Sequence, residues 1–358
     1  MTNSTANSVE TTTGEMARNP VIDVLRVLSQ FFVVGSHAIY LVDWIYALGF
    51  ASWTLPLVRN STVFFMFMSG YLFALGLPRY SFKGLWKKRF RTVMVPYLIC
   101  LIPMVVIYTM DAKYRTDVKA WAALIFTGAN FVNRALWFFP LILSFYLISP
   151  ISARVYRHEK SFLGLVFATM IVSFLVHRPT FVENLHHSLL YFLFPYYAGM
   201  ALFRYEKQVF AFMKKGHWFV LLALIGVVAW QADIGPEWRA RRGYQTYRSL
   251  SEVTWKTWDL SAIQKTLIFF LSYYYLSVSE RALRVFKPLE WFSPYCFGIH
   301  LYHGYLMSLY MHYFLLAPSK NVVSGFFLAW IGFWFASVAF VVVISKLTGR
   351  RSIHLFGH

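Results

Sequence analysis

Arg26 and His37 are the residues whose types and spacing most directly suggest chemistry in this chain. They are separated by ten residues within one long apolar stretch. Ionisable side chains inside a bilayer are costly and rare, so each is a candidate functional residue. Eleven helical steps of about 100° come to three turns plus roughly 20°, which places both side chains on one face, about 16 Å apart along the axis. This spacing predicts a polar track that leads inward from one membrane surface.

His300 and His303 lie three residues apart on one face of a second apolar stretch. Counted up from the same membrane surface, His303 stands about 18 Å and His37 about 24 Å along its helix, so we expect the two to meet in one cavity. An imidazole there can take a proton from a hydroxyl or act as a nucleophile. The alternative is that the histidines only pack between helices while Arg26, paired with Asp23, extends to the surface. A metal site is not predicted, because no carboxylate or cysteine set accompanies them.

Two single residues and a basic cluster complete the candidate site. Arg59 lies in an apolar stretch and needs an acidic or carbonyl partner, or a water-filled cavity. Ser69 precedes Gly70, and this small pair is typical of a close approach between helices. The strongest basic cluster is formed by Lys87, Lys88, Arg89 and Arg91. It is explained either by membrane topology alone or by binding of a ligand with several phosphates.

The composition is that of a polytopic membrane protein. Of 358 residues, 58% are hydrophobic and 14% are charged, against about 25% charged in a soluble domain. Apolar stretches of about 20 residues recur, which predicts an all-α bundle of about ten transmembrane helices. The net charge of +19 is spread over short loops, which indicates membrane topology and excludes a nucleic-acid-binding protein. Both cysteines, Cys100 and Cys296, lie in apolar stretches and are interpreted as packing residues.

Ten spans are predicted, at roughly 21–46, 52–78, 92–110, 135–155, 162–177, 188–204, 217–232, 260–280, 291–316 and 322–347. With the N-terminus inside, the inner segments carry 20 Lys and Arg residues and the outer segments 11, which favours an N-in, C-in orientation. Residues 1–20 are predicted to be a disordered cytoplasmic tail, 21–347 the transmembrane domain and 348–358 a short cytoplasmic tail. The segment 117–129 is too short to span, so we expect an interfacial or re-entrant helix.

Six strings occur in order along the chain: Ile22–Arg26 followed by His37, Phe64–Leu72, Lys88 and Arg91 followed by Val95–Tyr97, Leu136–Phe139, Pro195–Gly199, and Gly298–His303. Together they resemble the motifs of the membrane-embedded acyltransferase-3 family. Each string is weak alone, and their order makes the set specific. The chain departs from the family at His300, where a tyrosine is usual, and in the last span, which lacks the carboxylate that many members use beside the base. Arg59 before the Phe-rich string resembles the compact branch that succinylates periplasmic glucans.

The resemblance implies transfer of an acyl group from cytoplasmic acyl-CoA to a hydroxyl of an envelope or exported glycan or glycolipid, at the inner or plasma membrane. It implies that His37 is the general base or a transient acyl carrier, and that His303 assists near the acceptor. The donor would be held by Arg26, Lys88 and Arg91. We expect the substrate side to include Arg59, Ser69 and His300. Acetyl-CoA or succinyl-CoA would be a co-substrate, and no permanently bound cofactor is expected.

Two other classes of function remain open from the sequence. A transporter or exporter of a small anionic or glycan-related substrate would also carry charged residues within its spans. A non-catalytic membrane scaffold would use the same histidines for packing alone. The enzyme is distinguished from both by release of CoA that depends on His37.

Overall fold

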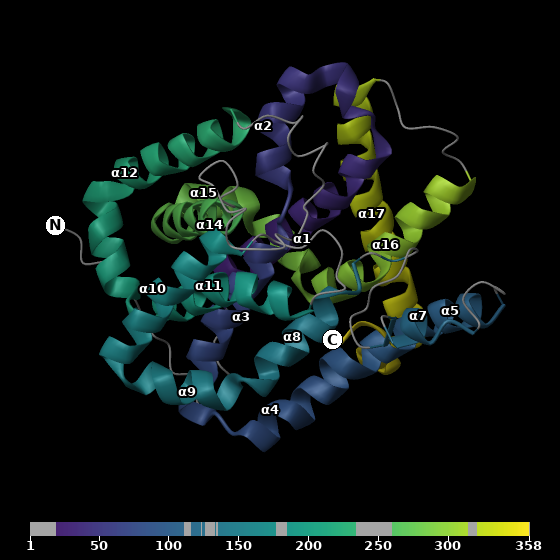
Figure 1. The fold of residues 1–358 in the computed structure, drawn as a ribbon, viewed down its shortest axis with the longest axis horizontal. Coiled ribbons are helices and arrows are strands. Elements are labelled where there is room, and N and C mark those ends of the chain that lie inside the picture. Colours follow the sequence, from purple (N-terminus) through teal and green to yellow (C-terminus); the bar gives the residue numbers. More distant parts are fainter. Residues whose placement is uncertain are drawn as a thin grey trace.

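The computed structural model describes residues 19–110, 116–122, 124–125, 133, 135–176, 185–233, 260–313 and 321–357. Within these ranges every regular element is a helix, which confirms the all-α prediction (Figure 1). Residues 1–18, most of the predicted N-terminal tail, and most of the segment 123–132 lie outside the described residues. Of the predicted interfacial helix at 117–129, the structure describes α7 (Val118–Ala122).

Each of the ten predicted apolar stretches contains a helix, but the stretches 52–78 and 135–155 are each divided between two helices. Their bounds are α1 (Pro20–Ala38), α2 (Leu48–Val58), α3 (Thr62–Gly76), α4 (Phe82–Arg89), α5 (Val95–Met110), α8 (Phe138–Leu147), α9 (Ser149–Arg157), α10 (Glu159–Leu175), α11 (Leu185–Arg204), α12 (Glu206–Asp233), α14 (Ser261–Val278), α15 (Glu280–Phe286), α16 (Cys296–Tyr313), α17 (Val322–Thr348) and α18 (Ser352–Phe356). A π-helical turn, η4 (Phe90–Met94), joins α4 to α5, and the 3₁₀ segment η8 (Lys287–Tyr295) leads into α16.

Among the described residues, five helical segments are long and apolar enough to cross a membrane: Pro20–Leu41, Gly49–Arg79, Phe82–Met110, Glu206–Ala232 and Val322–Thr348. A sixth is obtained if α8 and α9, which meet at a 52° bend, form one span. The protein is therefore a multi-pass membrane protein. The remaining predicted spans include α14 and α16, whose buried polar side chains such as Lys265 and His303 lower their mean hydropathy. Ten spans and the N-in, C-in orientation remain predictions.

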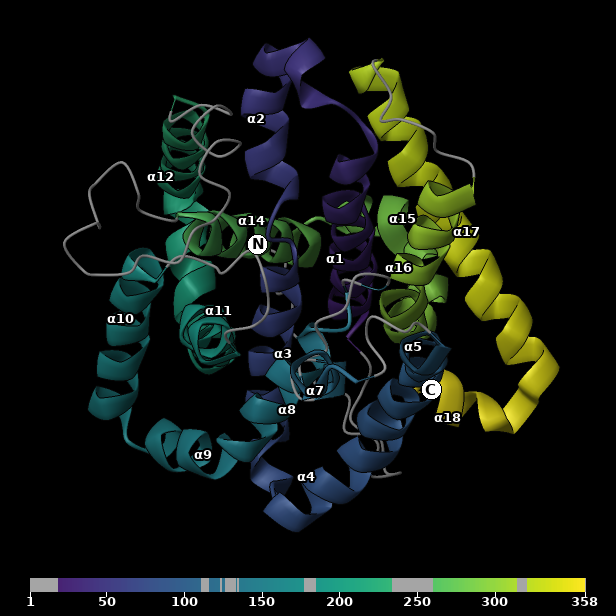
Figure 2. The same cartoon turned by 45° about the vertical axis from the view of Figure 1, so that its right-hand side comes forward.

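Helix α1 lies at the centre of the bundle, between α3 on one side and α16 and α17 on the other (Figure 2). Its start is fixed locally, because the Asn19 side chain accepts a hydrogen bond from the backbone N–H of Val21 at 3.0 Å and Pro20 occupies the first turn. Further along, the Trp330 indole of α17 donates to the Phe31 carbonyl and lies against Gly35, where no side chain would fit. These contacts hold the polar face of α1 toward α16 and η8.

Two glycines allow α3 and α11 to cross with their backbones in contact. A Cβ at Gly70 would lie 1.8 Å from the carbonyl oxygen of Tyr196, and one at Gly199 would lie 1.9 Å from that of Phe67. Small residues at such crossings let helices pack closely where no hydrophobic effect drives them together. The close approach predicted from Ser69-Gly70 is confirmed, and it leaves the neighbouring Ser69 side chain on another face of the helix.

A single added methyl group at this crossing is expected to destabilise the protein. Gly70→Ala should lower the free energy of unfolding by about 3 kcal/mol, the upper end of ordinary overpacking costs, because the obstructing atom is backbone and cannot rotate away. The matched control is Gly164→Ala in α10, where a Cβ would meet no atom within 4 Å. Thermal unfolding in detergent measures both variants, and equal midpoints for the two would contradict the crossing.

Candidate active site

Arg26 lies near the start of α1 and is held there by two partners. Its Nη1 lies 3.2 Å from Oδ1 of Asp23 and 3.0 Å from the Ser293 hydroxyl of η8, and that hydroxyl donates to the same Asp23 oxygen at 2.6 Å. Asp23 is buried, whereas about a third of the Arg26 side chain is exposed. The predicted pairing of Asp23 and Arg26 is confirmed. Because the carboxylate is shared with Ser293, the guanidinium keeps further N–H groups that can face a ligand.

A cavity of about 620 Å³ opens beside Arg26, and its walls are stripes of residues at helical spacing. The wall residues of α3 are Phe65, Met68, Ser69, Leu72, Phe73 and Gly76. Those of α8 are Phe138, Ile142 and Tyr146, and those of η8 and α16 are Ser293, Pro294, Cys296, Phe297 and His300. The stripe of α3 extends about 16 Å along its axis. The cavity is therefore long and runs parallel to the helices.

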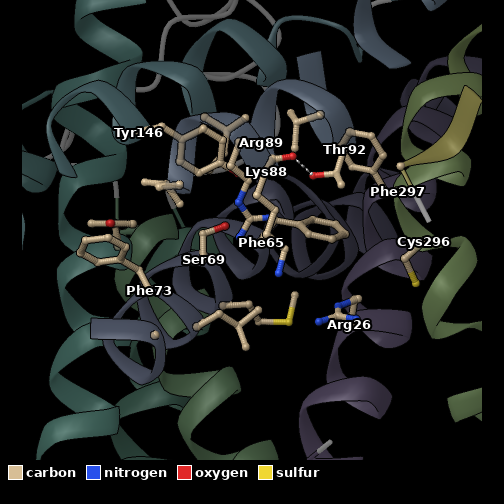
Figure 3. A pocket seen from close by; sticks show the side chains of 18 of the residues that line it. Arg26, Phe65, Ser69, Phe73, Lys88, Arg89, Thr92, Tyr146, Cys296 and Phe297 are labelled. Carbon is tan, nitrogen blue, oxygen red and sulfur yellow. Dashed lines mark hydrogen bonds between the residues drawn. The ribbon is translucent and has the colours of Figure 1, made fainter. Parts of the chain in front are cut away.

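The end of the cavity nearest α4 is strongly basic. Arg79, Lys88 and Arg89 line it, and no carboxylate lies among the described residues of the whole wall, which also includes Arg26. Figure 3 shows the Lys88, Arg89 and Arg26 side chains around the same space as Ser69. The Arg89 guanidinium stacks over the Tyr146 ring at 5.3 Å, which fixes its orientation. Four cations around one cavity form a site for a ligand with several negative charges.

The opposite end of the cavity is aromatic. The ring of His300 lies 4.9 Å from that of Phe138, 5.5 Å from Phe65 and 5.6 Å from Phe139. His300 is 4% exposed; the Ala135 carbonyl faces its ring, yet neither ring nitrogen has a hydrogen bond of normal geometry within the described part of the chain. His300 is the polar side chain among the rings at this end of the cavity.

His303 and His37 form a pair one helical turn beyond His300. Their ring centroids lie 5.0 Å apart, and the His300 and His303 centroids 5.7 Å apart. The predicted meeting of His37 and His303 is therefore present. Nδ1 of His303 lies 2.9 Å from the Ile299 carbonyl, which can only accept, so this nitrogen carries the proton. Its Nε2, which makes no hydrogen bond to any described residue, is left as an acceptor beside His37.

The structure does not bring every predicted residue to the cavity. Ser69 and Lys88 line it, whereas Arg91 is exposed in η4 and is not among its described wall residues. Arg59 ends α2 at the break before α3, also away from the wall. That the site holds no metal, and the role of each residue, remain predictions.

Sequence reasoning missed Arg79, Arg89 and Lys265. Arg89 belonged to the basic cluster, but only the π-helical turn after it decides which basic side chains face inward. Lys265 is fully buried, and its Nζ donates to the carbonyls of Pro56 and Leu57 at 2.7 and 2.8 Å. It thereby satisfies carbonyl groups released where α2 ends inside the bundle. The sequence signal for Lys265 was the presence of a lysine within an apolar stretch.

The comparison with protein families decides the class to which this fold belongs. The family described as an acyltransferase domain, acyltransferase-3, matches residues 19–348, or 330 of the 358 residues. The chain belongs to the acyltransferase-3 family. Membership makes it a membrane acyltransferase in general terms. No curated protein and no solved structure matches the chain.

The anchor of Arg26 yields a stability prediction. Asp23→Asn removes the negative charge but keeps the shape of the side chain, so Arg26 loses its counter-charge. The free energy of unfolding should fall by about 1–2 kcal/mol, a modest amount because Arg26 is partly exposed. Glu280→Gln, at an exposed position of α15, is the control and should change the unfolding midpoint little. An Asp23→Asn midpoint as high as that of the wild type would show that the ion pair does not anchor α1.

Proposed function

We propose that this protein is an integral-membrane O-acyltransferase. It moves an acetyl or succinyl group from cytoplasmic acyl-CoA to a hydroxyl of an envelope or exported glycan or glycolipid. The observation that carries the proposal is the change in character along one cavity. Three cations line one end, Arg26 lies partway along, and His300 lies at the other end, one turn from the His303–His37 pair. Family membership supports acyl transfer as the reaction class, and the change from a cationic to an aromatic wall supports acyl-CoA as the donor.

The chemistry of acyl-CoA fits this change from a cationic to an aromatic wall. Its nucleotide carries several phosphate charges, which would lie among Arg79, Lys88 and Arg89. Its slim pantetheine arm would follow the wall past Ser69, and the thioester would reach the aromatic end beside His300. Arg26, held by Asp23 and Ser293, would face the arm partway along. With the N-terminus inside, the α4 end opens to the cytoplasm, where acyl-CoA is found.

The histidine pair supplies the base. With the unprotonated Nε2 of His303 beside it, we infer that His37 acts as the general base through one of its ring nitrogens. That nitrogen takes the proton of the acceptor hydroxyl as its oxygen attacks the thioester carbon. The C–S bond then breaks, and the CoA thiolate leaves with a proton returned from the protein. His303 stands beside His37, and the last span, α17, supplies no carboxylate.

The first test of this function is release of CoA by the purified protein in detergent. Acetyl-CoA and succinyl-CoA are offered separately, with and without envelope glycan extracts as acceptor. His37→Ala should lower CoA release about 10²–10⁴-fold, the range for loss of a general base, while donor binding is retained. Preference between the two donors identifies the acyl group.

The same experiment separates the enzyme from its alternatives. Movement of a substrate across vesicles with no new ester and no CoA release would favour a transporter. A His37→Ala variant that releases CoA at the wild-type rate would remove His37 from the chemistry. Failure of folded wild-type protein to bind either donor would contradict the enzyme altogether.

The basic end of the cavity gives a second prediction. Lys88→Ala and Arg89→Ala should each weaken acetyl-CoA binding about tenfold or more, because each removes charge-assisted contacts to phosphate. S-acetylpantetheine, which has the arm and the thioester but no nucleotide, should react equally well with the variants and with the wild type. Isothermal titration measures binding, and CoA or pantetheine release measures turnover.

Arg91→Ala is the comparison for these variants, since Arg91 belongs to the same cluster but lies outside the cavity wall. Its donor affinity should stay within about twofold of the wild type. An Arg91 effect as large as that of Arg89 would place the nucleotide over the outer surface of η4. Equal losses with S-acetylpantetheine would show that the cations support the fold and not the nucleotide.

A further inference from the structure

Gln30 is a fully buried polar residue in the middle of α1, and no contact within the described residues accounts for its buried amide. Its exposed fraction is 0%, and neither its Oε1 nor its Nε2 makes a hydrogen bond to any described residue. A buried amide left in this state costs about 1–3 kcal/mol, so most proteins satisfy such groups or remove them. An unmet donor and acceptor at a reactive centre are explained if a substrate uses them.

The helical position of Gln30 places it between the donor cavity and the histidine pair. Gln30 follows Arg26 by four residues and precedes His37 by seven, so all three lie within about 40° of one another around α1. Along the axis it stands about 6 Å above Arg26 and about 10 Å below His37. Arg26 lines the cavity, and His37 contacts His303. Gln30, which is not itself among the described wall residues of the cavity, therefore lies at a level between the cavity and the base.

Helix α16 packs against α1 and carries further unmet polar groups. Both ring nitrogens of His300 and Nε2 of His303 lack hydrogen bonds within the described residues. His37 and His303 are already used as base and partner. Attack on a thioester also needs an N–H donor for the carbonyl oxygen, because that oxygen becomes an anion in the tetrahedral intermediate. A carboxamide supplies such a donor without exchanging a proton.

We propose that the Gln30 carboxamide N–H donates a hydrogen bond to the carbonyl oxygen of the donor thioester and stabilises the oxyanion during acyl transfer. This inference rests on the proposed function. The acceptor oxygen forms the new C–O bond, His37 takes its proton, and the C–S bond breaks. Gln30 keeps both of its N–H protons throughout, so its contribution is electrostatic and is greatest in the transition state.

Gln30→Met and Gln30→Leu test the inference, since both keep roughly the size of the side chain and remove its polar atoms. Each should lower kcat about 10²–10³-fold, as loss of one oxyanion donor does. Affinity for acetyl-CoA should change less than twofold. Thermal stability should be unchanged or higher, because an unsatisfied amide is removed from a buried position. A glutamine with a structural role would show the reverse effect on stability.

Gln264→Met on α14 is the matched control. Gln264 is also fully buried, and its Nε2 makes no hydrogen bond to a described residue, but its Oε1 accepts from the Lys265 ammonium at 3.0 Å, which gives it a structural role that Gln30 lacks. This variant should lose thermal stability and keep the kcat of the molecules that remain folded. The two buried glutamines thus have opposite expected signatures.

Several outcomes would overturn the inference. It fails if Gln30→Met or Gln30→Leu keeps the wild-type kcat, or if both variants lose stability or do not fold, since the amide would then be structural. If the wild type and Gln264→Met turn over and Gln30→Met equals them, only this inference fails. If the wild type releases no CoA from either donor, the proposed function fails as well.

Discussion

The cost of holding polar groups inside an apolar bundle is the constraint on which this structure depends. Helix α1 places Arg26, Gln30 and His37 on one stripe, and such a stripe is stable only against neighbours that compensate it. Asp23 and Ser293 compensate Arg26 through two short contacts, and His303 lies beside His37. Gln30, between them, has no hydrogen bond within the described residues. The polar stripe therefore has partners at both ends, and at its middle the Gln30 amide lacks them.

Close packing around α1 converts this stripe into a site. The glycine crossing of α3 and α11 fixes α3, and its other face then forms one wall of the cavity. The Trp330 contact fixes α1 against α17. At the end opposite α4, the rings of Phe138 and Phe65 lie against His300. The backbones of α3 and α11 touch at the glycine crossing, and the cavity lies between the wall residues of α3, α8 and α16.

Much of this arrangement could be predicted from sequence, because spacing along one helix is a local property. The shared face of Arg26 and His37 and the pairing with Asp23 follow from rise and turn alone, whereas the meeting of His37 with His303 was predicted from their similar depths below one membrane surface. Arg89 could not be separated from Arg91, since a π-helical turn shifts the faces by a fraction of a turn. Lys265 caps a helix 208 residues away in sequence, and no local pattern reports such a partner. Gln30 was visible on the stripe, but its lack of partners is a tertiary property.

The central claim is that one cavity holds acyl-CoA with its acyl end at the histidines. The most direct test is a cryo-electron microscopy structure with a thioether analogue of acetyl-CoA, which cannot transfer its acyl group. The account predicts the nucleotide among Arg79, Lys88 and Arg89, and the acyl carbon beyond Phe65, within reach of His37 and Gln30. The analogue bound outside this cavity, or bound with its nucleotide toward His300, would contradict it.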